Sequence, residues 1–152
     1  EPLVVLPHKV AHNACPATEL SETKIDQAFI GSCANGRIED FAIAAEIMAG
    51  RQVAPGVRMI VTPGSQSVFK EAMAKGYVAT LMDAGAVVTN STCGACYGGH
   101  MGVLGDGEVC ITASTRNFQG RMGSAEADIY LGSPATVAAS AVRGVITDPR
   151  EI

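Results

Sequence analysis

Short apolar runs alternate with longer segments of helical spacing along most of the chain. The apolar and β-branched runs predict strands, at residues 25–30, 57–61, 86–89, 109–113 and 128–131. The segments between them predict helices, at residues 39–49, 65–75, 79–84 and 134–143. Strands that alternate with helices are typical of βαβ units. We therefore predict an α/β fold, a layered domain with about four or five mainly parallel strands, flanked by helices and covered on both faces.

Residues 1–24 lack this regular pattern. Pro2, Pro7 and Pro16 interrupt the segment, which predicts an irregular N-terminal arm or inter-domain linker. Residues 25–152 then form one α/β domain of ordinary size. Because the first residue is Glu and the opening reads like the interior of a longer chain, we expect a processed or excised piece.

Composition narrows the class of protein. The chain is 47% apolar and 17% charged, which provides for a sizeable core. No apolar run approaches the roughly 20 residues that cross a bilayer, and no signal peptide is recognised, so we expect no membrane partner. The net charge is −4 without a stripe of basic residues, which argues against nucleic acid as a partner. Five cysteines in a signal-free chain indicate reduced thiols in the cytoplasm or an organelle matrix.

The first chemically interesting segment is Gly31-Ser32-Cys33-Ala34-Asn35-Gly36-Arg37, a tight turn from a strand into a helix. A thiol just before a helix would face unpaired N–H groups and the positive end of the dipole, which favour the thiolate form. A buried structural cysteine in a glycine-rich turn fits the same residues. Cys33 alone therefore leaves both interpretations open.

The second segment is Cys93-Gly94-Ala95-Cys96. This spacing occurs in redox dithiols, in halves of zinc sites and in iron–sulfur sites. A structural zinc ion takes four protein ligands, whereas Cys33, Cys93 and Cys96 are the obvious thiolates and His100 is the only nearby nitrogen. A metal centre or cluster and a redox pair both remain open.

The third segment carries Arg116 and Arg121, five residues apart with Gly120 between them. Two such guanidinium groups form a clamp suited to carboxylates. The alternative is a pair of solvated surface arginines. The segment follows a predicted strand, and parallel sheets bind ligands beyond the carboxyl ends of their strands.

Taken together, G-S-C-x-N-G-R, then C-G-x-C about sixty residues further on, then R-N-F-x-G-R resemble the aconitase superfamily. Within it, the pattern is most similar to the C-terminal, cluster-bearing part of isopropylmalate dehydratases and homoaconitases. The resemblance covers residues 25–152, including the Val-Thr-Pro-Gly-Ser loop at 61–65 and the helix start at Ser133. Three motifs in the same order and spacing make it specific.

The resemblance implies a cofactor. Cys33, Cys93 and Cys96 match the three cysteines that hold a 4Fe–4S cluster in this superfamily. The fourth iron has no protein ligand there and acts as a Lewis acid on the substrate's hydroxyl and carboxylate.

The resemblance also implies a substrate site. Arg116 and Arg121 match arginines that bind substrate carboxylate, and Ser32, Asn35 and Thr115 match positions of the cluster pocket. Thr115 departs from the family, which usually has Asn there. A hydroxyl lacks the reach of an amide, so we expect cluster tuning at this position to differ.

The activity implied is that of a hydro-lyase. It isomerises a small hydroxy-di- or tricarboxylate, of the isopropylmalate, homocitrate or citrate type, by dehydration and rehydration. Dehydration needs an acid and a base, which in the family come from N-terminal large-subunit domains and from a swivelling domain or small subunit. No residue of this sequence matches them, so we assign no catalytic residue and expect the chain to be inactive without those partners.

Two alternatives belong to other classes. A metal- or cluster-binding regulatory module without catalysis would need a basic face if it bound RNA, which the net charge opposes. A redox protein would use Cys93 and Cys96 but leave Cys33 and both arginines unexplained.

The remaining cysteines and histidines match no ligand position. Cys110 lies in a predicted strand, where it fits a small core hydrophobe, and Cys15 lies in the arm. His100 fits a hydrogen-bonded scaffold residue, and His8 and His12 fit surface positions.

Overall fold

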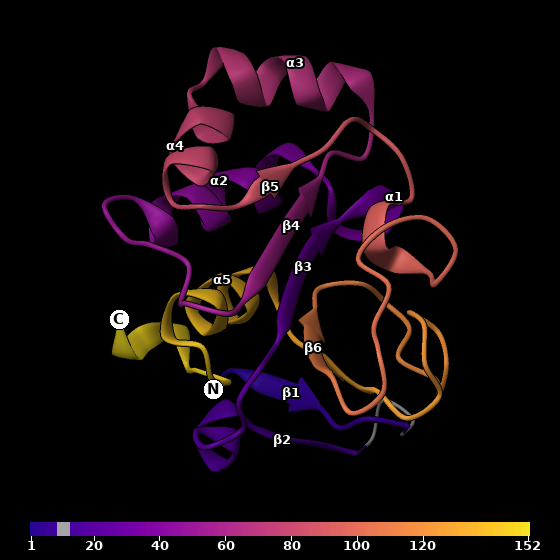
Figure 1. Ribbon diagram of the computed structural model, residues 1–152. Helices are drawn as coiled ribbons and strands as arrows, with labels where there is room; N and C mark the ends of the chain where they lie inside the picture. The colour runs from indigo at the N-terminus through magenta and orange to yellow at the C-terminus, as the bar shows by residue number, and fades with distance from the viewer. Residues whose placement is uncertain (9–12) are drawn as a thin grey trace.

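The computed structural model describes residues 1–8 and 13–152 and confirms the α/β fold (Figure 1). Its sheet follows the order β2-β1-β7-β6-β3-β4-β5. The five strands from β3 to β7 run parallel to one another. They are β3 (Gln27–Gly31), β4 (Arg58–Thr62), β5 (Val87–Val88), β6 (Val109–Thr112) and β7 (Asp128–Leu131).

The N-terminal segment adds two further strands to the sheet. Strand β1 (Leu3–Val5) pairs antiparallel with β2 (Ala14–Pro16) and with β7, and the 3₁₀ turn η1 (Ala17–Leu20) follows. The prediction of an irregular arm over residues 1–24 is therefore wrong for these stretches. Strands of three residues are too short to show an alternating pattern. His12 lies outside the described residues, and a domain boundary at residue 24 stays a prediction.

The helices agree with the predicted segments to within about two residues. They are α2 (Ile38–Met48), α3 (Gln66–Ala74), α4 (Tyr77–Asp83) and α5 (Pro134–Arg143), with the single turn α1 (Ser32–Asn35) and the 3₁₀ turns η2 (Gly94–Cys96) and η3 (Pro149–Glu151). Local chemistry explains the ends of α5. The Ser133 hydroxyl accepts from the Thr136 N–H, and Gly144 ends the helix in the left-handed conformation. None of the helices in the described part of the chain has the length and apolarity needed to cross a membrane.

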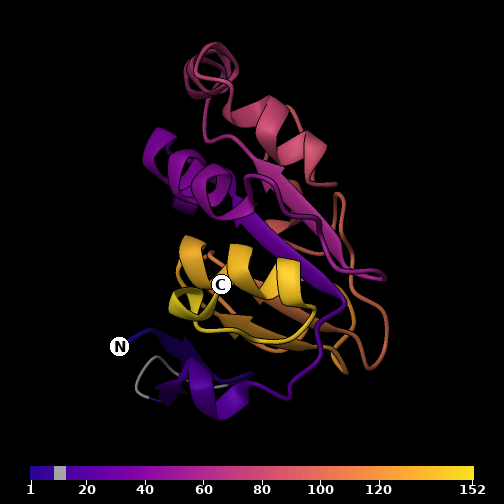
Figure 2. The same cartoon turned by 90° about the vertical axis from the view of Figure 1, so that its left-hand side faces the viewer.

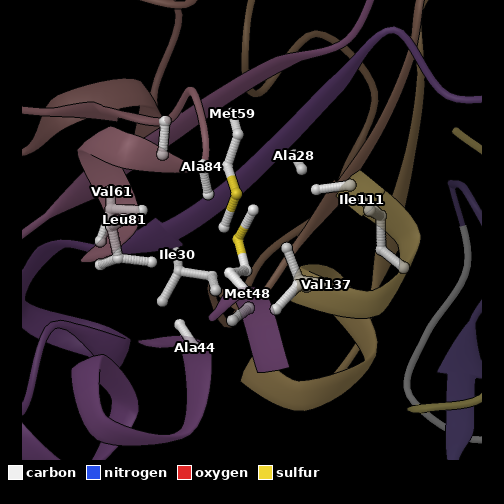
Figure 3. Packing of buried hydrophobic residues seen from close by; sticks show 14 of the residues in the cluster. Ala28, Ile30, Ala44, Met48, Met59, Val61, Leu81, Ala84, Ile111 and Val137 are labelled. Atoms are coloured by element: carbon white, nitrogen blue, oxygen red, sulfur yellow. The ribbon is translucent and has the colours of Figure 1, made fainter. Parts of the chain in front are cut away.

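The main core lies between the sheet and one layer of helices. Alternate side chains of the central strands, such as Ala28, Ile30 and Val61, pack against residues of α2, α4 and α5. Figure 3 shows this layer around Met48 and Met59, and Figure 2 shows α2 and α5 on the same side of the sheet.

The opposite face has a smaller core and a different cover. Phe29, Ile60 and Cys110 point to this side and pack with Ala95, Leu104, Met122, Ala127 and Ile129. These partners come mainly from η2 and from the connections around β6, so the second face is covered by irregular chain and a 3₁₀ turn. The expected cover on both faces is present, but the long helices are confined to one of them.

Candidate functional site

The strand order reverses between β3 and β6, two adjacent parallel strands in the middle of the sheet. From β3 the chain continues outward to β4 and β5, and from β6 it continues in the other direction to β7. A crevice opens outside the carboxyl ends of the strands at such a reversal. Cys33 follows β3, and Thr115 and Arg116 follow β6. The topology therefore brings these predicted site residues to one edge of the sheet.

The turn that carries Cys33 has an unusual backbone. Ser32 has a positive φ of 63°, which costs a non-glycine residue roughly 1–3 kcal/mol. Gly31, at φ 142°, lies so close to β4 that a Cβ would overlap the Thr62 carbonyl oxygen. The Cys33 side chain is exposed beyond this turn. Because α1 spans only four residues, the placement of the thiol owes more to the strained turn than to a helix dipole.

The Cys93–Cys96 segment folds into the 3₁₀ turn η2, closed by a hydrogen bond from the Cys96 N–H to the Cys93 carbonyl at 3.1 Å. Cys93 is exposed and Cys96 is partly buried. Between them Gly94 has φ 56°, and a Cβ there would overlap the Thr62 Oγ1 and lie 3.2 Å from the Phe29 ring. Only glycine fits this close approach to β3 and β4.

Both cysteine loops therefore pack against Thr62. It is fully buried at the end of β4, and its Oγ1 lies 2.7 Å from the Thr89 Oγ1. The sequence signal for it was the 61–65 loop, to which no role was assigned. Its contacts with Gly31 and Gly94 bring the two loops to the same strand end, although 60 residues separate Cys33 from Cys93.

The arginine loop is fixed by a residue that the sequence analysis left without a role. The buried Asn117 side chain donates to the Leu6 carbonyl at 2.8 Å and to the Ile129 carbonyl at 3.0 Å. It ties the loop to the N-terminal segment and to β7. Arg116, next to it, is exposed. Within the described residues, no carboxylate pairs with the Arg116 side chain.

Arg121 has different surroundings from Arg116. Its Nε donates to the Cys96 carbonyl at 2.9 Å, and its Nη2 lies 3.6 Å from the Cys96 Sγ. The guanidinium carbon lies 5.5 Å from the centre of the Phe118 ring. Of the two predicted substrate arginines, one is thus open to solvent and the other contacts a predicted cluster ligand.

The three predicted pocket residues differ in burial and contacts. Ser32 is buried, and the Asn35 amide donates to the Ala113 carbonyl across the β3–β6 boundary, while Thr115 is exposed. Beside them lies Ser114, whose buried Oγ has no hydrogen-bond partner in the described part of the chain. No sequence signal pointed to Ser114.

The other two cysteines are partly or fully buried, whereas His8 and His100 are exposed. Cys110 is fully buried in the core, as predicted, and burial raises the pKa of its thiol to about 12. Burial also raises the pKa of the partly buried Cys15 in β2, with a smaller contribution from Glu19. His100 is exposed, and the His8 Nε2 lies 3.1 Å from an Asp128 carboxylate oxygen.

The donor set suits a thiolate-bound centre, but its thiols are not gathered into a ligand group. Cys33, Cys93 and Cys96 are all free thiols that reach the surface at least in part. Over residues 1–8 and 13–152, no three His, Cys, Asp or Glu side chains lie close enough to hold one metal ion. The structure therefore supplies suitable ligands on adjoining loops, without a closed site.

Comparison with protein families decides the assignment that the motifs suggested. Residues 6–144 match the model of the aconitase family (aconitate hydratase). The chain belongs to the aconitase family. The match confirms the resemblance drawn from the cysteine and arginine motifs, and it includes β2, one of the two strands that the sequence pattern missed.

Within the aconitase family, the chain is similar to large subunits of one type of dehydratase. It is 64% identical over 151 residues to the 3-isopropylmalate dehydratase large subunit of Mycolicibacterium smegmatis. The corresponding subunits of Aliarcobacter butzleri and Saccharolobus solfataricus are 55% and 54% identical over 153 and 152 residues. These alignments cover 99–100% of this chain but only 36% of each relative's length.

Proposed function

We propose that this chain is the cluster-bearing part of a hydro-lyase of the 3-isopropylmalate dehydratase type. One observation carries the proposal. Two cysteine loops far apart in sequence are seated on the same residue, Thr62, at the carboxyl edge of the sheet, in a chain 64% identical to part of such an enzyme.

In this proposal Cys33, Cys93 and Cys96 hold a 4Fe–4S cluster. Three thiolates match a cluster that leaves one iron without a protein ligand, and cysteine is the usual ligand of such clusters. When bound, the cluster supplies a Lewis acid that polarises the leaving hydroxyl. The close seating of Gly31 and Gly94 on Thr62 supports this ligand set, because it fixes the backbone on both sides of the site.

Arg116 is proposed to bind a substrate carboxylate. Its exposed guanidinium follows β6 at the same sheet edge as Cys33. A planar two-pronged donor suits a carboxylate better than a point charge does. Holding one carboxylate orients the carbon skeleton relative to the cluster, and the substrate class is therefore a small hydroxy-di- or tricarboxylate.

The groups that transfer protons are proposed to lie outside this chain. Dehydration removes a proton from carbon and delivers one to the leaving hydroxyl, and we assign neither role to a residue here. The chain spans about 36% of the length of its relatives, so further domains of the large subunit and a small subunit would supply these groups. They would also cover the exposed Cys33 and Cys93 and exclude water.

Turnover by the complete enzyme tests the proposed function. The full-length large subunit, assembled anaerobically with its small subunit, should dehydrate 2-isopropylmalate faster than citrate or homocitrate. Cys33→Ser should reduce turnover roughly 100-fold or more, since Lewis-acid assistance contributes several kcal/mol. Cys15→Ser, a change in strand β2, should leave the rate unchanged.

Two results would overturn the proposal. One is an iron-loaded complex that turns over none of the three hydroxy-acids. The other is a Cys33→Ser variant as active as the unmodified enzyme.

A further inference from the structure

The two arginines of the R-N-F-x-G-R motif do not share one environment. Arg121 is bound to Cys96 by two separate contacts, from Nε to the carbonyl oxygen at 2.9 Å and from Nη2 to the Sγ at 3.6 Å. Arg116 is exposed, without a carboxylate partner among the described residues. A common role as two equal substrate clamps does not explain this difference.

The main chain reinforces the link between Arg121 and the cysteine loop. The Gly98 N–H donates to the Arg121 carbonyl at 2.9 Å, so backbone and side chain of one residue both hold the Cys96–Gly98 segment. Gly98 itself lies against Gly123 and Met122, where a Cβ would come within 2.6 Å of the Gly123 nitrogen. The segments around residues 97 and 122 are therefore tightly apposed.

The turn at Phe118 also contacts Arg121. The Arg121 N–H donates to the Phe118 carbonyl at 3.0 Å, which closes a tight turn. The Phe118 ring then lies beside the guanidinium, 5.5 Å from ring centre to carbon, within the range of a cation–π interaction. The Arg121 side chain is already restrained by these contacts, so it loses little further conformational freedom when Cys96 binds a metal centre.

These contacts occupy a particular edge of the guanidinium. Arginine has five N–H donors, and a carboxylate can approach side-on at Nε and Nη2 or end-on at the two Nη atoms. The Nε–Nη2 edge of Arg121 faces Cys96. Side-on binding of a substrate carboxylate is thereby excluded unless Arg121 leaves Cys96.

We propose that Arg121 is a positioning residue for the cluster ligand Cys96, an inference that rests on the proposed function. Through its bond to the Cys96 carbonyl it fixes the ligand loop, and through Nη2 it donates a hydrogen bond to the ligating sulfur. Groups that hydrogen-bond a metal's ligands change metal affinity roughly 10- to 100-fold. Hydrogen bonds to the sulfurs also set the reduction potential of an iron–sulfur cluster.

The test compares Arg121→Met with Arg116→Met in the full-length large subunit, assembled anaerobically with its small subunit. Methionine keeps an unbranched apolar stem but donates no hydrogen bond. The rate of iron release to a chelator and the midpoint potential of the cluster are measured without substrate. Thermal unfolding of the metal-free proteins serves as the control for folding.

Arg121→Met should release iron roughly 10- to 100-fold faster and have a lower midpoint potential, because an N–H donor to sulfur stabilises the more negative reduced state. Arg121→Lys keeps the charge but not the planar two-pronged donor, so its iron-release rate and midpoint potential should lie between those of Arg121→Met and the unmodified protein. Arg116→Met should match the unmodified protein in both measurements. The proposal is overturned if Arg121→Met releases iron within twofold of the unmodified rate, keeps the unmodified midpoint potential and changes KM alone.

Hydrogen exchange of the metal-free protein separates this inference from the proposed function. The Gly98 amide and its neighbours should exchange faster in Arg121→Met than in Arg116→Met. Equal exchange would contradict the positioning role, whether or not the unmodified protein takes up iron. If the unmodified protein takes up no iron but the exchange difference is observed, the proposed cluster is contradicted while the Arg121–Cys96 contact is supported.

Discussion

Two arginines five residues apart illustrate how far residue type alone determines a role. The sequence predicts a pair of carboxylate clamps, and the structure leaves Arg116 exposed while Arg121 contacts Cys96. The difference arises from the turn at Phe118, which directs the second side chain back toward the cysteine loop. A prediction about substrate binding therefore belongs to Arg116.

Arg116→Lys in the complete enzyme should lower kcat/KM at least about tenfold. Lysine keeps the charge but loses the planar donor pair, and a charge-assisted hydrogen bond contributes roughly 1.5–3 kcal/mol. The iron content should not change. Arg143→Lys, in the last turn of α5, is the control and should remain within about twofold. An equally small effect of Arg116→Lys would show that Arg116 is a solvated surface residue.

At the scale of elements, the contact between η2 and β4 joins the cysteine loop to the sheet. Gly94 has a positive φ and lies against Thr62, whereas Gly107 has a similar φ of 74° with nothing within 4 Å of an added Cβ. The two glycines form a matched pair. An alanine at residue 94 would combine backbone strain with a steric clash, whereas an alanine at residue 107 would have the strain alone.

Gly107→Ala should lower the free energy of unfolding by roughly 1–2 kcal/mol, the cost of a left-handed conformation. Gly94→Ala should cost roughly 1–3 kcal/mol more, because its Cβ must displace Thr62 in a packed interior. Urea unfolding of the two variants, measured under the same conditions, gives the difference. Equal losses would mean that η2 moves away from Thr62 without cost.

The sequence predicted those elements whose pattern is local. Apolar runs such as residues 57–61 and the periodic helices are visible in a window of ten residues, and the structure confirms them. Strands β1 and β2 were missed because each has three residues, and the pair joins the sheet only where β1 pairs with the distant strand β7. Tertiary pairing of this kind leaves no period in the sequence.

The candidate site was predictable in chemistry and less so in geometry. The motifs, through their resemblance to the aconitase family, predict Cys33, Cys93, Cys96 and the arginines as site residues, and this assignment stays a prediction. Thr62 and Asn117 were missed, since their importance lies in one close approach and two long-range hydrogen bonds. Such contacts depend on the folded arrangement and not on residue type.

At the scale of the whole molecule, the two ends of the parallel strands carry different groups of residues. The carboxyl ends carry the candidate site. At the amino ends, the Arg58 Nη2 lies 2.7 Å from a Glu108 carboxylate oxygen, and the Arg58 Nε donates to the buried Gln27 at 3.2 Å. This network ties together the starts of β3, β4 and β6, so we expect it to contribute to stability and not to catalysis.

Glu108 gives this network a dependence on pH. The Gly105 N–H, which donates to the Glu108 carboxylate at 2.8 Å, and then Arg58 lower the pKa of Glu108 below its usual value. Because the pKa of Glu108 is lower in the folded protein than in the unfolded chain, its carboxylate stabilises the fold at pH values above the unfolded pKa of about 4.3. This contribution is lost as the pH falls through the folded pKa.

The free energy of unfolding, measured by urea titration from pH 7 to pH 3, should therefore decrease on the acid side of pH 4.3. Part of this decrease should be missing in Glu108→Gln, which cannot change its charge. A Glu108→Gln curve parallel to that of the unmodified protein at every pH would show that this carboxylate has the same pKa in both states.

The most direct test of the central claim is the metal and sulfide content of the anaerobically purified full-length large subunit. The proposed ligand set predicts about four irons and four sulfides per chain, with Cys33→Ser, Cys93→Ser and Cys96→Ser each lowering or abolishing both. Cys15→Ser should retain the full content, as should Cys110→Ala, since the Cys110 thiol is buried in the core. Zinc without sulfide, or an equal loss of iron in Cys110→Ala, would contradict the proposed cluster and its ligands.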